Sequence, residues 1–391
     1  MGVPYLNDKL QGFGTSIFAE MSALAVATNS LNLGQGFPDT DGPAEILESV
    51  IDAMRSGKGN QYPPAPGIPE LRLAIAQHQQ RFYGIELDPD RQVLVTAGAT
   101  EAIAATLLSL LNAGDECIVF EPFYDSYPAC IAMAGARCVA VTLRAPRFDI
   151  DPNDLRAAIT SRTRMIILNS PHNPTGTVLG RETLQAIADI AIEHNLLVLA
   201  DEAYEHLTFD GVVHIPISTL PGMAERTLTV GSAGKTFSFT GWKVGWVTAI
   251  PELVNAVRTA KQFLTFVASG PFQYGIATGL ALGPEYFTAF AAELQTKRDL
   301  LMAGLESAGF HVFKPSGTFF ITTDISSFAD DAVTFCRSLP ERCGVVAIPN
   351  SVFYLNPGEG RTHVRFAFCK KETVIVEAAQ RLRTLARTNL Y

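Results

Sequence analysis

The feature that most constrains the fold is an alternation of short apolar strands with helical stretches between residues 90 and 250. This order of elements is typical of a parallel sheet covered by helices. The predicted strands are Val93–Thr96, Glu116–Phe120, Met165–Leu168, Leu196–Ala200, Thr227–Val230 and Trp246–Ala249. The sequence therefore predicts an α/β fold.

The alternation weakens outside this region. Helical patterns cover Ser16–Ala27, Ala44–Arg55, Glu70–Tyr83, Glu252–Phe263, Pro284–Ala308, Asp330–Arg342 and the C-terminal end. Strand patterns cover Thr318–Thr323, Val345–Pro349 and Val364–Phe368. We expect three parts. A large domain (46–275) contains the parallel sheet, a small α+β domain (276–391) follows it, and an N-terminal segment (1–45) joins the small domain.

Polar and aromatic residues follow five of the predicted strands. In an open parallel sheet, ligands bind beyond the carboxyl ends of the strands, so these segments are expected to meet at one site. The segments are Ala97–Thr100, Glu121–Asp125, Asn169–Gly176, Asp201–Tyr204 and Gly231–Gly245.

The last of these segments contains two lysines, Lys235 and Lys243, among glycines and hydroxyl-bearing residues. A desolvated lysine beside another cation has a depressed pKa, as an amine that forms a Schiff base requires. The second lysine is suited to holding a phosphate. From these residues alone, a glycine-rich turn with two solvated lysines remains an alternative.

The upstream strand ends favour the first interpretation, because they supply the partners of a pyridine cofactor. Asp201 follows a buried strand and is suited to holding a ring nitrogen protonated. Singly, each residue has a simpler explanation, such as a helix cap at Asp201. Together they predict a site for a pyridine cofactor that carries a phosphate. The other proposed contacts are Asn173 and Tyr204 at the phenolic oxygen, Tyr124 over the ring, and Ala99, Thr100, Ser232 and Lys243 at the phosphate.

One cluster offers a different chemistry. Asp201, Glu202, Glu205 and His206 are close enough in sequence to suggest a metal site. The pyridine site uses Asp201 better, and the six cysteines form no zinc-type spacing with histidines, so we expect no metal.

Composition excludes several classes of partner. The net charge is −9 with no basic block, which argues against nucleic acid. No apolar run approaches the ~18 residues of a membrane span. The N-terminus lacks the pattern of a signal peptide, and no Cys-x-x-Cys pair occurs, so we expect a reducing, cytoplasmic location.

The chain resembles the fold type I pyridoxal-phosphate-dependent aminotransferases of class I/II over essentially its whole length. The matching motifs are Asn173-Pro174-Thr175-Gly176, Asp201-Glu202-Ala203-Tyr204, Ser232-Ala233-Gly234-Lys235, Gly241-Trp242-Lys243-Val244-Gly245 and Val364-Arg365-Phe366. Within that family, Asn32–Asp39 and Glu121–Tyr127 are most similar to two groups. These are the kynurenine aminotransferase/glutamine transaminase K group and the actinobacterial N-succinyldiaminopimelate aminotransferases. The resemblance implies a mostly parallel seven-stranded sheet in the large domain.

The resemblance also implies roles for individual residues. Lys235, Asp201 and Tyr204 would be catalytic. Arg365 would bind the substrate α-carboxylate with help from Asn169 and Gly36. The family forms homodimers with shared active sites, to which the partner subunit would contribute Tyr62 at the cofactor and Phe266 at the substrate. Phe18 occupies the position of an aromatic lid, and Lys243 replaces the arginine that holds the phosphate in aspartate aminotransferases.

The substrates of such an enzyme are an amino acid and a 2-oxo acid such as 2-oxoglutarate. The segment 263–268 lacks the second arginine of aspartate-type enzymes, and Phe18, Phe123, Tyr124 and Phe266 favour neutral, aromatic or sulfur-containing side chains. N-succinyl-LL-diaminopimelate remains a second candidate. Three alternatives stay open: a carbon–sulfur β-lyase on the same fold, a non-catalytic cofactor-binding regulator, and a nicotinamide dehydrogenase, for which no Gly-x-Gly-x-x-Gly follows the early strands.

Overall fold

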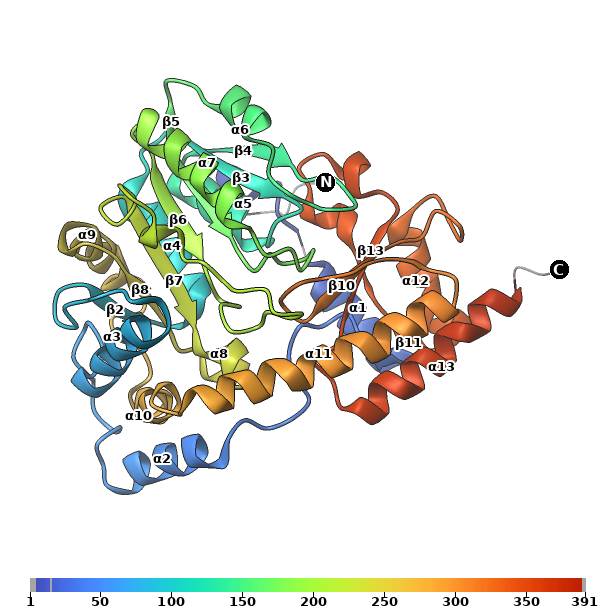
Figure 1. Ribbon diagram of the computed structural model, residues 1–391, viewed down its shortest axis with the longest axis horizontal. Coiled ribbons are helices and arrows are strands. Elements are labelled where there is room, and N and C mark those ends of the chain that lie inside the picture. The colour runs from blue at the N-terminus through green and yellow to red at the C-terminus, as the bar shows by residue number, and fades with distance from the viewer. Residues whose placement is uncertain (1–4, 15, 389–391) are drawn as a thin grey trace.

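A seven-stranded sheet forms the centre of the larger part of the protein (Figure 1). The computed structural model describes residues 5–14 and 16–388. In order across the sheet, the strands are β2 (Val93–Thr96), β8 (Gly245–Thr248), β7 (Thr227–Ser232), β6 (Leu197–Asp201), β5 (Thr163–Asn169), β3 (Glu116–Glu121) and β4 (Arg137–Thr142). Only β8 runs antiparallel to its neighbours. The predicted α/β fold with a mostly parallel sheet of seven strands is confirmed.

Alternate residues of the central strands pack on opposite faces of the sheet, because side chains in a strand have a period of two. Ile118 and Ile166 pack on one face, whereas Cys117 and Met165 pack on the other. The first face is covered by α6 (Pro152–Ala158) and α7 (Arg181–Glu193); the second is covered by α4 (Gly98–Leu110), α5 (Ser126–Ala134) and α9 (Pro251–Lys261). Burial on both faces explains why these strands are continuous apolar runs.

Three helices enclose the β2–β8 edge of this sheet. They are α2 (Ala44–Arg55), α3 (Pro69–Tyr83) and α10 (Gly270–Leu280), and α10 packs against the other two. Their apolar side chains form a separate core with Val93, Val95 and Trp246.

The C-terminal part contains a four-stranded antiparallel sheet in the order β12 (Ile348–Pro349), β13 (His363–Ala367), β10 (Phe320–Asp324) and β9 (His311–Phe313). Around it lie α1 (Ile17–Ala27), α11 (Pro284–Ser307), α12 (Ala332–Cys343) and α13 (Glu372–Thr388). Figure 1 shows α11 running along the molecule from α10 to α13. None of the helices in the described residues is both long and apolar enough to cross a membrane.

The N-terminal segment packs with the C-terminal part. β1 (Leu31–Asn32) pairs in parallel with β11 (Val345–Val346), and Met21 and Leu33 share one core with Phe366. The division into 1–45, 46–275 and 276–391 stays a prediction. Short 3-10 helices occur at η1 (Asp8–Leu10), η2 (Ile217–Thr219), η3 (Thr240–Trp242), η4 (Asn350–Phe353) and η5 (Pro357–Gly360).

Local structure departs from the sequence expectation in several places. The expected strand Val345–Pro349 is divided, because β11 pairs with β1 whereas β12 pairs with β13. The expected strand Thr318–Thr323 begins only at Phe320, since Thr318 has a φ of 64°. The sequence analysis also assigned none of α5, α6, α10, β9 and the edge strand β4.

Candidate active site

A cavity of about 380 Å³ lies beyond the carboxyl ends of β5, β6 and β7. Of the fifteen predicted site residues, thirteen line this cavity, although they come from both parts of the chain. They are Phe18, Gly36, Ala99, Thr100, Tyr124, Asn169, Asn173, Asp201, Tyr204, Ser232, Lys235, Lys243 and Arg365. The expectation that the strand ends meet at one site is therefore confirmed.

Asp201 ends β6 and is almost fully buried. Its Oδ2 accepts a hydrogen bond from the Tyr127 hydroxyl at 2.6 Å, and its Oδ1 accepts one from the Ala203 N–H at 3.2 Å. Burial raises the pKa of the Asp201 carboxyl, although these hydrogen bonds act in the opposite direction. A buried carboxylate held in this way is suited to pairing with a cationic ring nitrogen.

Lys235 lies in the one-turn helix α8 (Ala233–Thr236), directly after β7. Its Nζ donates a hydrogen bond to the Gly36 carbonyl oxygen at 3.2 Å. Removal from bulk water, together with the smaller effect of the cations of Arg365 and Lys243, lowers the pKa of the Lys235 amine to about 8. The amine is thus more nucleophilic near neutral pH than an ordinary lysine.

The close approach of Gly36 has a steric cause. A Cβ atom at Gly36 would lie 2.5 Å from the Phe320 ring, so a side chain cannot be accommodated there without movement. Only glycine lets the N-terminal segment come this close to Lys235.

The beginning of α4, together with Ser232 and Lys243, forms a region suited to a phosphate, which we call the phosphate cradle. Gly98 has a φ of +78°, and a Cβ there would lie 3.3 Å from Lys243 Nζ. Ala99 and Thr100 follow in the first turn of the helix, and Ser232 lines the same cavity. Free backbone N–H groups at a helix N-terminus beside a lysine provide a site for a phosphate.

Arg365 projects from β13 into the cavity and is 2% exposed. Its Nη1 donates to Asn173 Oδ1 and its Nη2 to the Gly34 carbonyl oxygen, each at 3.0 Å, but its Nε has no partner. Burial lowers the pKa of Arg365 to about 10. A buried guanidinium bonded only to neutral acceptors is suited to binding a carboxylate.

Hydrogen bonds to other residues of the protein fix the side chains of Asn169 and Asn173. Asn169 Nδ2 donates to the Asp201 carbonyl oxygen at 2.9 Å, and Asn169 Oδ1 accepts from the Asn173 N–H at 2.8 Å. Asn173 in turn contacts Arg365. The structure thus links Asn169 to both the Asp201 and the Arg365 regions of the cavity.

Tyr62 and Phe266 do not line the cavity. Their side chains are exposed, by 81% and 53%, and their rings contact each other with centroids 5.3 Å apart. Exposed aromatic rings of this kind are typical of residues covered by another protein surface.

The sequence analysis missed two polar residues near the cofactor position. Tyr127 donates to Asp201, and Asp125 lines the cavity within electrostatic range of Arg365. Both lie in the segment after β3 that the sequence analysis singled out, but only the packing of α5 shows where their side chains point.

The cavity therefore combines a buried carboxylate, an amine of lowered pKa, a phosphate cradle and a buried guanidinium. These groups fit pyridoxal 5'-phosphate together with an amino acid. A profile of the family described as "Aminotransferase class I and II" matches residues 28–382. The chain belongs to this family. It is a pyridoxal-phosphate-dependent aminotransferase.

Several known aminotransferases resemble this one over nearly their full lengths. A solved structure of N-succinyldiaminopimelate aminotransferase from Mycobacterium tuberculosis is 48% identical, with a TM-score of 0.95, covering 97% of this chain and 100% of that one. Methionine aminotransferase of Escherichia coli (strain K12) is 40% identical, covering 97% and 98% of the two chains. Kynurenine–oxoglutarate transaminase of Dictyostelium discoideum is 38% identical, covering 97% and 96%. Both groups recognised from sequence are thus represented.

The lowered pKa of Lys235 predicts how this aminotransferase takes up its cofactor. Below a pH of about 8 the amine is protonated and cannot attack the cofactor aldehyde. The uptake rate of the apoprotein should therefore rise about tenfold per pH unit below that value and level off above it. Stopped-flow absorbance over this range, with a free lysine derivative as reference, measures the profile. A rate that keeps rising to pH 10 would show an ordinary lysine pKa.

Proposed function

We propose that this aminotransferase transfers the amino group of an L-amino acid with a neutral, aromatic or sulfur-containing side chain to a 2-oxo acid such as 2-oxoglutarate. The observation that carries the proposal is the setting of Arg365. Its guanidinium lies 4.0 Å from the Phe320 ring centroid and 5.2 Å from those of Phe18 and Phe353. The carboxylate site is therefore bordered by aromatic rings. In the described part of the chain, Arg365 is the one arginine that lines the cavity.

N-succinyl-LL-diaminopimelate is the second candidate amino donor. It is supported by the 48% identity to the Mycobacterium tuberculosis enzyme named for that substrate. Its side chain carries distal carboxylates, so it requires cationic or donor groups beyond those that line the cavity.

The proposed roles follow from the contacts described above. Bound pyridoxal phosphate supplies an aldehyde that takes up amino groups and a ring that withdraws electrons. Arg365 holds the substrate α-carboxylate, which orients the bond between the α-carbon and its hydrogen. Lys235 Nζ then removes the proton from the α-carbon. Asp201 would accept the hydrogen bond of the protonated ring nitrogen, and Tyr204 and Asn173 would contact the phenolic oxygen.

The remaining cofactor contacts complete the proposal. Lys243, Ser232, Thr100 and the start of α4 at Ala99 hold the phosphate. The Tyr124 ring would cover the cofactor, and its hydroxyl lies 3.4 Å from Thr100 Oγ1.

We infer that the active enzyme is a homodimer in which Tyr62 and Phe266 complete the site of the partner subunit. Their mutual contact and exposure support this, as does the neighbouring exposure of Phe263 and Leu264. Sedimentation analysis should give a dimer, and mixing Lys235→Ala with Tyr62→Ala chains should restore activity through one intact site per mixed dimer. A fully active monomer would contradict the inference.

Arg365→Lys should lower kcat/KM for every amino donor by a similar factor, about 10²–10³. Lysine keeps the charge but loses the planar fork that binds a carboxylate with two hydrogen bonds. Steady-state kinetics with at least three donors of different side chain measure the effect. A loss confined to one donor would make Arg365 a specificity residue instead.

The experiment that tests the proposed function is an absorbance titration of the holoenzyme with single amino acids, without a 2-oxo acid. We expect conversion to the aminated cofactor, reversed by 2-oxoglutarate, with the fastest conversion by aromatic or sulfur-containing donors. Release of ammonia without any aminated cofactor would favour the carbon–sulfur β-lyase. Fastest conversion by N-succinyl-LL-diaminopimelate would favour the second candidate.

A cytoplasmic location stays a prediction. It is supported by the cysteines, since all six are free in the structure.

A further inference from the structure

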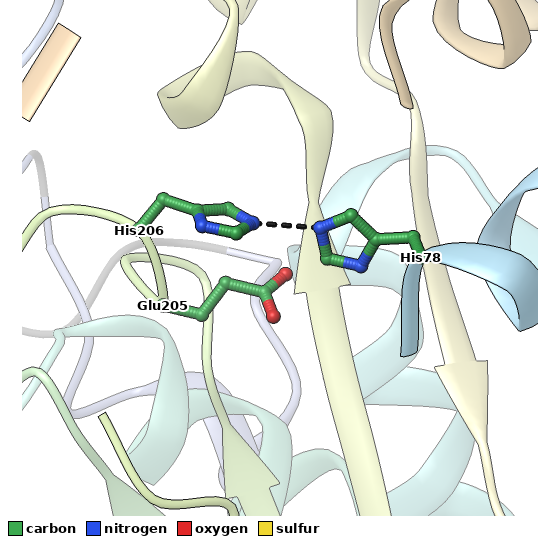
Figure 2. A group of neighbouring side chains, drawn as sticks. All are labelled: His78, Glu205 and His206. Carbon is green, nitrogen blue, oxygen red and sulfur yellow. Dashed lines mark hydrogen bonds between the residues drawn. The ribbon is translucent and has the colours of Figure 1, made fainter. Parts of the chain in front are cut away.

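A group of buried polar side chains outside the cofactor cavity has no role in the reaction described above. His78 on α3 meets Glu205 and His206, which follow β6 (Figure 2). The Nε2 atoms of the two histidines lie 2.6 Å apart, and the potential ligand atoms of all three residues lie within 4.8 Å of one another. His78 is 1% exposed and Glu205 is 6% exposed, so water does not solvate them freely.

Unpartnered polar atoms concentrate around this group. Among the described residues, thirteen buried side-chain N or O atoms lack a hydrogen-bond partner, and six of them belong to this region. The six are His78 Nδ1, Gln79 Oε1, Glu202 Oε2, Glu205 Oε2 and both ring nitrogens of His214. His214 Nε2 and Glu202 Oε2 lie 3.0 Å apart and pair with each other, which leaves His78 Nδ1, Gln79 Oε1, Glu205 Oε2 and His214 Nδ1 without a partner. Buried polar atoms are nearly always satisfied, so such a concentration indicates a bound water or ion.

We propose that His78, Glu205 and His206 bind a divalent transition-metal ion, of which Zn²⁺ is the best match. Two imidazoles and one carboxylate are a ligand set that zinc prefers. For both Nε2 atoms to bind the ion, the ring that carries the shared proton would take the tautomer protonated at Nδ1. Tetrahedral bonds of about 2.0–2.1 Å place two ligating nitrogens about 3.3 Å apart, so the rings must separate by less than 1 Å. His206 is only half-buried and lies in an irregular segment, which allows this movement.

The surrounding groups define what the ion would do. The rings of Phe82 and Phe287 pack against both histidines, and the Arg81 guanidinium lies over these rings. Because His78 and Glu205 are buried outside the cofactor cavity, the ion would be structural, with a water as its fourth ligand. It would join α3 to the segment that carries Asp201 and Tyr204.

Metal content provides the test. The holoenzyme is stripped with a chelator, equilibrated with Zn²⁺ alone and analysed by mass spectrometry for metal per chain. Co²⁺ in place of Zn²⁺ gives a visible absorption spectrum that reports its coordination. The variants are His78→Gln and Glu205→Gln. The control is His311→Gln, which alters an exposed histidine on β9.

We expect the wild type and the control to retain one ion per chain and to unfold at a higher temperature with Zn²⁺. Each ligand variant should bind Zn²⁺ more than about 100-fold more weakly, which exceeds the loss of about 10–100-fold caused by removing an outer-shell partner. If His78→Gln does not fold, Glu205→Gln, which conserves shape, gives the result. A wild type that retains no zinc, or ligand variants that retain as much as the control, would overturn the proposal. Transamination without zinc would leave the proposed function intact.

Discussion

Replacement of Lys235 by alanine is expected to lower transamination by at least about 10⁴-fold. The variant loses both the amine that attaches the cofactor and the group that moves the proton at the substrate α-carbon, and positioned proton transfer alone contributes about 10²–10⁴-fold. The position of Lys235 Nζ, which lies in the cavity beside Gly36 and within reach of the charges of Asp201 and Arg365, is the basis for this expectation. Steady-state kinetics with an amino donor and 2-oxoglutarate measure the loss.

Two controls separate chemistry from folding in the Lys235→Ala variant. Cofactor content should remain measurable, because the phosphate cradle and Asp201 are unchanged. Small primary amines added to the solution should restore part of the rate, since they can occupy the space of the deleted side chain. A variant that keeps more than a tenth of the wild-type rate would exclude Lys235 as the base.

The Asp201→Asn variant should lose about 10²–10³-fold in kcat and should release its cofactor more readily. Asparagine keeps the size of the side chain but cannot stabilise a protonated ring nitrogen, and removal of one aligned electrostatic partner costs about this much. The existing hydrogen bonds from Tyr127 and Ala203 hold the carboxylate in place, so the change is local.

Asp201→Glu provides the matched comparison for Asp201→Asn, because it restores the charge at a shifted position. We expect its rate to lie between those of the wild type and the asparagine variant. Cofactor affinity, measured by equilibrium dialysis, should follow the same order. A wild-type rate in Asp201→Asn would show that another carboxylate serves the ring nitrogen.

Most of the cavity could be predicted from sequence because strand ends have a simple geometry. Parallel strands are buried runs with recognisable limits, and their carboxyl ends lie at one edge of the sheet. The residues after β5, β6 and β7 therefore had to be neighbours. The resemblance to aminotransferases then supplied the residues that no strand end indicates, such as Phe18 and Arg365.

Other features could not be predicted because they depend on packing between distant segments. His78 and His206 are 128 residues apart, and nothing in the sequence of α3 indicates that they touch. The hydroxyl of Tyr127 reaches Asp201 only because of how α5 lies on the sheet. The division of Val345–Pro349 between two sheets follows from a choice of partner strands that local propensity does not encode.

The pairing of β1 with β11 also bears on synthesis of the chain on the ribosome. Gly36, whose carbonyl oxygen accepts from Lys235, belongs to a segment held by contacts with residues made last. The Gly34 carbonyl oxygen accepts from Arg365 at 3.0 Å, and the Phe37 carbonyl oxygen accepts from Lys370 at 2.8 Å. Residues 31–37 therefore cannot complete these contacts until translation is almost complete. A nascent chain that ends before Val345 has every cofactor-binding strand end but lacks the partner that places Gly36 beside Lys235.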